Sequence, residues 1–142
     1  MKKHYKFIIV STLTFIAFAV FGFFWHNNLF PTVYYSTALV IPMNEQNVIP
    51  INFAMALLVY GLAYFMFKSI KQETRFYQAV LRGVYYLISV IGTYSFLNIG
   101  LVKSWQWNVL ILDILWAVVS GALAGAMVFG LHRLLMREKV EK

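Results

Sequence analysis

The sequence predicts an all-α membrane protein, a four-helix transmembrane bundle with both termini on the cytoplasmic side. Apolar residues make up 61% of the 142 residues and charged residues only 12%. A soluble domain usually has about 25% charged residues, so this chain has too little polar surface to cover a water-exposed globule. Four apolar runs of about 20 residues, each long enough to cross a bilayer, account for most of its length.

Charged residues separate these four runs. The first is uncharged throughout, and the second opens with Pro50, whose missing N–H costs nothing in the first turn of a helix. Arg82 and Lys103 flank the third, and the fourth alone contains a carboxylate. The predicted spans, all in a single domain 1–142, are residues 7–25, 49–67, 83–102 and 107–131.

The distribution of Lys and Arg orients the predicted bundle. Eleven of the twelve cations precede the first span, lie between the second and third, or follow the fourth, and Lys103 is the exception. Cations near short loops remain in the cytoplasm. We therefore predict a multi-pass protein of the inner (cell) membrane with cytoplasmic termini and its longest loop, residues 26–48, outside.

Two segments have a second interpretation. The N-terminus resembles a signal peptide with a small-residue cleavage site near Ala17, although the apolar run continues to Trp25, which favours a span. The loop 26–48 contains no Lys or Arg and is either a lid or a connector that lies on the membrane surface.

Asp113 is the only acidic residue in a predicted span, six residues inside Trp107. A charged side chain at the centre of a membrane helix costs roughly 2.5–3.5 kcal/mol on insertion scales, so Asp113 is expected to face protein. It either binds a ligand or a proton or fixes the packing of the helices. The expected outer polar pocket consists of Trp25, Tyr94, Asn98, Asp113 and Trp116.

Small residues recur every four positions after Asp113, at Ala117, Gly121 and Gly125. They share one helix face with it and allow a second helix to approach closely. The row serves either packing within the chain, the favoured interpretation, or contact with a second copy.

Several chemistries are excluded or disfavoured. The chain has no cysteine, which excludes disulfides and thiol catalysis, and its three histidines show no metal-binding spacing. No nucleophile motif or phosphate-binding loop is present, and the cations do not form a nucleic-acid face. We expect neither catalytic residues nor a metal or other cofactor.

The segments YSFLNIGLVKSWQW and LDILW carry a family resemblance. They resemble Y-D-x-T-N-x-x-x-x-K-G-W-P followed by V-D-x-x-W, the pattern of a bacterial membrane-protein family catalogued as domain of unknown function 2177. In the first half, Trp25 and Tyr34 match the nine-residue spacing of the family. The matching positions in the second half are Tyr94, Asn98, Lys103, Trp105, Asp113 and Trp116.

Four positions depart from that pattern. Gly22 and Ser95 stand where the family has aspartates, Leu97 replaces a threonine and Gln106 a proline. Two of the three carboxylates that the resemblance implies are therefore missing, and the chain is a divergent member.

These observations favour a non-enzymatic membrane protein that accompanies a partner or binds a small or lipidic ligand in the outer pocket. The alternative is a small dimeric proton-coupled transporter that uses Asp113, and a membrane enzyme or quinone-binding electron carrier ranks third. The expected partners are the lipid bilayer, a membrane protein or second copy, and a lipid or small hydrophobic ligand, but not nucleic acid.

Overall fold

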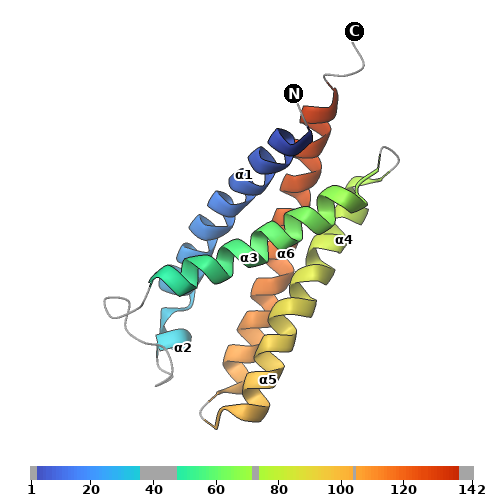
Figure 1. The fold of residues 1–142 in the computed structure, drawn as a ribbon. Helices are drawn as coiled ribbons and strands as arrows, with labels where there is room; N and C mark the ends of the chain where they lie inside the picture. The colour runs from blue at the N-terminus through green and yellow to red at the C-terminus, as the bar shows by residue number, and fades with distance from the viewer. Residues whose placement is uncertain (1–2, 36–47, 72–73, 104, 138–142) are drawn as a thin grey trace.

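The computed structural model describes residues 3–35, 48–71, 74–103 and 105–137, and within these ranges it contains helices and no strand. The prediction of an all-α fold is confirmed. Two of the elements, η1 and η2, are π-helical. In chain order the elements are α1 (Lys3–Phe24), η1 (Trp25–Leu29), α2 (Pro31–Tyr35), α3 (Val48–Ser69), α4 (Phe76–Leu87), η2 (Ile88–Gly92), α5 (Thr93–Leu101) and α6 (Trp107–Arg137) (Figure 1).

Three to four helical segments have the length and apolar character needed to cross a membrane. Three of them, His4–Leu29, Phe76–Leu101 and Trp107–Leu135, contain 26, 26 and 29 residues. The fourth, α3, has 22 residues, and the apolar stretch described within it is the shorter Phe53–Ser69. The chain therefore has the architecture of a multi-pass membrane protein.

The helices extend beyond the predicted spans. The predicted third span starts at Gly83, whereas α4 begins at Phe76. Arg82, a predicted boundary, lies inside α4, and its Nη1 donates a hydrogen bond to the carbonyl of Ser69 at 2.5 Å. Its charge therefore caps the end of α3. The first helix begins before its predicted start, at Lys3, and the last continues past its predicted end to Arg137.

Helix α6 runs through the middle of the molecule, α1 and the continuous α4–η2–α5 rod lie on either side of it, and α3 crosses in front (Figure 1). The start of α1 and the end of α6 lie at the end of the molecule where α3 ends and α4 begins. Buried side chains such as Val10, Leu62, Met66 and Val128 fill the centre. Many apolar side chains point outward, as expected for a surface that contacts lipid.

Helices α4 and α6 approach each other through glycine. A Cβ atom added to Gly121 would lie 2.7 Å from the carbonyl oxygen of Gly83, and one added to Gly125 would lie 2.6 Å from that of Ala79. Ala117, the first member of the row, is fully buried. The structure therefore places the small-residue row against α4 of the same chain, so this surface is not open to a second copy.

Candidate functional site

The side chain of Asp113 connects three elements in the half of the bundle that contains α2 and α5. The Tyr34 hydroxyl of α2 donates to Oδ1 at 3.1 Å, and the Ser95 hydroxyl of α5 donates to Oδ2 at 2.6 Å. Asp113 is half-buried, whereas Ser95 is fully buried. Among the described residues it is the only acid. Both carboxylate oxygens are thus oriented by hydroxyl groups from separate helices.

Aromatic rings enclose this carboxylate on the side of α1. Trp116, three residues after Asp113, packs against Phe18 and Trp25 with ring centroids 5.2 and 5.6 Å apart. The ring of His26 lies 4.5 Å from that of Tyr34 and 5.5 Å from that of Trp116. Trp25 and Trp116 are 7% and 5% exposed. Two of the predicted pocket residues therefore form a wall beside Asp113.

The π-helical turn η1 continues α1 up to this wall. The backbone N–H of Phe30 donates to the carbonyl of Trp25, five residues earlier, which is the π-helical pattern. A His26 ring nitrogen, Nδ1, lies 2.8 Å from the carbonyl oxygen of Gly22, in hydrogen-bonding contact with the preceding turn. The turn therefore presents Trp25 and His26 to Tyr34 and Trp116.

Tyr34 lies in α2, between the spans. Burial raises the pKa of its hydroxyl, the Asp113 carboxylate raises it further, and the Trp25 indole acts in the opposite direction. The phenol therefore remains protonated at physiological pH, and it can act as a hydrogen-bond donor to Asp113.

A shift in helical phase explains why Ser95 contacts Asp113. Up to Leu87 the buried positions are four residues apart, as in an α-helix, and an unbroken α-helix would next bring Tyr94 to the same face. The π-turn η2 adds one residue, so Ser95 takes that place. The successive buried positions on this rod are Ala79, Gly83, Leu87, Gly92 and Ser95.

Tyr94 consequently does not join the cluster, and this part of the predicted pocket is corrected. Its side chain is 59% exposed and packs edge-on against the ring of Trp105 at 6.0 Å. Asn98, one turn after Ser95 on α5, is half-buried, and no hydrogen bond joins it to Asp113. The sequence reasoning assumed a continuous α-helical period across the third span, and that assumption fails at η2.

Three buried side-chain N–H groups have no hydrogen-bond acceptor within the described part of the chain. They belong to Nε1 of Trp25, Nδ2 of Asn98 and Nε1 of Trp105. The Trp25 indole lies close enough to the Tyr34 hydroxyl to lower its pKa. Buried polar groups are rarely left unpaired in proteins.

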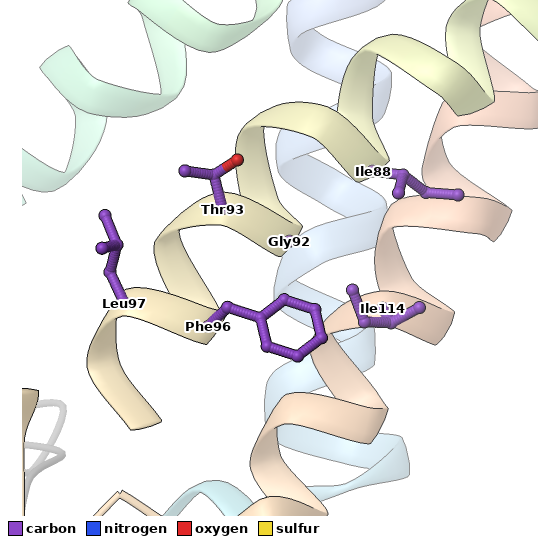
Figure 2. Close-up of a pocket in the computed structure, with 6 residues that line it drawn as sticks. All are labelled: Ile88, Gly92, Thr93, Phe96, Leu97 and Ile114. Carbon is purple, nitrogen blue, oxygen red and sulfur yellow. The ribbon is translucent and has the colours of Figure 1, made fainter. Parts of the chain in front are cut away.

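A separate groove of about 460 Å³ lies between η2, α5 and α6, where Gly92 leaves room beside Ile114 (Figure 2). Its one polar lining side chain, Thr93, donates its hydroxyl to the carbonyl of Ser89 at 2.5 Å. The groove therefore presents an apolar surface, and the Asp113 cluster is not part of it. It is lined by Ile88, Gly92, Thr93, Phe96, Leu97 and Ile114.

Metal binding has no visible basis in the described ranges, where no three His, Cys, Asp or Glu side chains lie together. His26 belongs to the aromatic wall. His132 packs its ring against Phe67 at 4.9 Å, in a different part of the bundle.

Comparison with known families decides the affiliation of the chain. The model of a family described as "Predicted membrane protein (DUF2177)" matches residues 7–130. The chain belongs to the DUF2177 family. The resemblance found in the sequence is thereby confirmed. No curated protein and no solved structure matches this DUF2177 protein.

The two departures from the carboxylate pattern of the DUF2177 family lie beside the site. A Cβ atom at Gly22 would lie 3.5 Å from the ring of Trp116, and Ser95 donates its hydroxyl to Asp113. The fold thus gathers all three positions of the pattern around one centre. In this DUF2177 protein that centre retains a single carboxylate, and a hydroxyl occupies the position nearest to it.

Tyr34 was not among the predicted neighbours of Asp113. Its nine-residue spacing from Trp25 was the available signal, because that spacing belongs to the pattern on which the family resemblance rests.

Proposed function

We propose that this DUF2177 protein is a non-enzymatic multi-pass membrane protein that binds a small or lipidic ligand at the Asp113 cluster, alone or as an accessory to a partner membrane protein. The observation that supports the proposal is a half-buried carboxylate held between Tyr34 and Ser95 beside an aromatic wall. Ionisable residues inside the membrane are costly, and their default interpretation is functional.

The arrangement favours binding over chemistry. Tyr34 and Ser95 both donate to Asp113, which fixes the carboxylate between two hydroxyl groups. The aromatic wall adds apolar area next to a single polar centre, a combination typical of small-molecule sites. The dimeric transporter is less favoured because the small-residue row packs against α4 of the same chain.

The test is the amount of bound ligand in an Asp113→Asn variant. The amide keeps the shape of the side chain but replaces one acceptor oxygen with a donor, so we expect at least tenfold less ligand, equivalent to about 1.4 kcal/mol. The measurement is native mass spectrometry of protein extracted from its own membranes in mild detergent.

A Thr93→Val variant is the matched control, because its hydroxyl bonds only to its own helix. It should retain ligand as the wild type does. If Asp113→Asn lowers the unfolding temperature but leaves the bound ligand unchanged, Asp113 is structural and the proposal is wrong.

For the orientation, we propose that both termini are cytoplasmic in the inner membrane. The exposed cations Lys68, Lys71 and Arg75 lie in the last turn of α3 or between the end of α3 and the start of α4, at the same end of the molecule as the start of α1 and the end of α6. Lys103 lies between α5 and α6. This distribution is that of the positive-inside rule.

The natural absence of cysteine allows a direct test of orientation. A cysteine at exposed Gln106 should react with a membrane-impermeant maleimide in intact cells. A cysteine at exposed Lys71 should react only after permeabilisation. The reverse labelling pattern would invert the proposed topology.

A further inference from the structure

The unpaired N–H groups near Asp113 differ from the rest of the polar cluster. Tyr34 and Ser95 already bond to both carboxylate oxygens, whereas Trp25, Asn98 and Trp105 present buried donors that have no acceptor among the residues the structure describes. A buried donor without a partner carries the full desolvation penalty of that group. A ligand that supplies an acceptor would remove this penalty.

Two of these donors adjoin the same part of α5. Asn98 follows Ser95 by one turn, so it lies further toward the α5–α6 connection than the Asp113 bond. Trp105 stands in that connection, and its ring packs against Tyr94, one turn before Asn98. The third donor, Trp25, lies in the aromatic wall on the other side of Asp113.

The N–H donors and the Asp113 carboxylate together restrict the charge of a ligand group that could bind here. A cationic group could still reach a free lone pair of Asp113, whose oxygens each accept one hydroxyl, but it brings no acceptor for the N–H donors. An anionic group would face the carboxylate in surroundings of low dielectric constant, where repulsion is strong. A neutral oxygen satisfies N–H donors without either cost.

We propose that Asn98 and Trp105 donate hydrogen bonds to a neutral carbonyl oxygen of an amphiphilic ligand held beside Asp113. The inference rests on the proposed function and specifies the chemical class of the ligand. Two membrane components carry such a group, the ester carbonyl of a glycerolipid and the ring carbonyl of a quinone.

Isosteric removal of the donors tests the proposal. Trp105→Phe keeps an aromatic ring and Asn98→Leu keeps a similar volume, but each removes the N–H group. We expect each to reduce ligand bound to protein from native membranes at least tenfold, and to leave the unfolding temperature of the ligand-stripped protein equal or higher. Trp107→Phe, which alters a tryptophan that is 64% exposed, should change neither.

Reconstitution distinguishes the two sources. Stripped protein is placed in ester-linked phosphatidylcholine, in its ether-linked analogue, which has no carbonyl, or in the ether-linked lipid with added ubiquinone. If the unfolding temperature is higher in the ester-linked lipid than in the ether-linked lipid, the ligand is a glycerolipid. If added ubiquinone raises the unfolding temperature in the ether-linked lipid, the ligand is a quinone. Either result supports the proposal if Trp105→Phe abolishes the increase.

The proposal is overturned if neither compound stabilises the wild type more than Trp105→Phe. It is also overturned if the stripped variants unfold at lower temperature than the stripped wild type, since the N–H groups would then be bonded within the protein or to water. If ligand binding is lost in Asp113→Asn but not in Asn98→Leu or Trp105→Phe, this inference is wrong and the proposed function stands.

Discussion

Gly121→Ala should lower the free energy of unfolding by about 2–3 kcal/mol, although alanine favours a helix by about 1 kcal/mol over glycine. The new methyl group would meet the carbonyl oxygen of Gly83 at 2.7 Å, the Cα of Val84 at 2.7 Å and the carbonyl carbon of Gly83 at 2.9 Å. All three are backbone atoms. No side-chain rotation can relieve these contacts, so α4 and α6 must separate along their whole interface.

Gly130→Ala is the matched control on the same helix, because nothing lies within 4 Å of a Cβ atom there. It should leave stability unchanged or raise it by up to about 1 kcal/mol. Steric trapping or denaturant unfolding in lipid bicelles would measure both. Equal stabilities of Gly121→Ala and Gly130→Ala would show that the close approach of α4 and α6 does not exist in the membrane.

The fold class was predictable because a bilayer leaves a chain few options. With no water to pair with backbone groups, an apolar span of about 20 residues must satisfy them internally, and a helix does so. The ends of the helices were less predictable. Arg82 looks like a boundary in the sequence, but its partner, the Ser69 carbonyl, belongs to the preceding helix and is visible only in three dimensions.

The residues of the candidate site could be predicted where their depth in the membrane alone places them at the site. They could not be predicted where the rotational phase of the helix decides which side chain faces Asp113. Asp113, Trp25 and Trp116 follow from their positions relative to the span ends. Tyr94 does not, because one additional residue in η2 turns α5 and places Ser95 in its position. A π-helical turn has no reliable sequence signature, although such turns are frequent at functional sites.

Asp113→Leu should lower the free energy of unfolding by about 2–5 kcal/mol, the second large effect. The substitution leaves the buried hydroxyls of Tyr34 and Ser95 without their acceptor, and each unpaired group costs about 1–3 kcal/mol. Unfolding in lipid bicelles is again the measurement. Stability equal to that of the wild type would mean that neither hydrogen bond forms.

Double-mutant cycles would measure the contributions of the Ser95 and Tyr34 hydrogen bonds separately. The lengths of the two bonds predict which contribution is larger. The Ser95 bond, at 2.6 Å, has the length of a hydroxyl bound to an ionised carboxylate, whereas the Tyr34 bond, at 3.1 Å, is longer than usual for two oxygens. Ser95→Ala with Asp113→Leu should therefore show a coupling energy of about 1.5–3 kcal/mol, and Tyr34→Phe a smaller one of about 0.5–1.5 kcal/mol.

Tyr94→Phe is the control for these cycles, and its expected coupling to Asp113→Leu is near zero. Its side chain is exposed and contacts Trp105, and an unbroken α-helix would have placed it where Ser95 lies. A coupling of Tyr94 equal to that of Ser95 would mean that α5 follows the unbroken α-helical phase in the membrane.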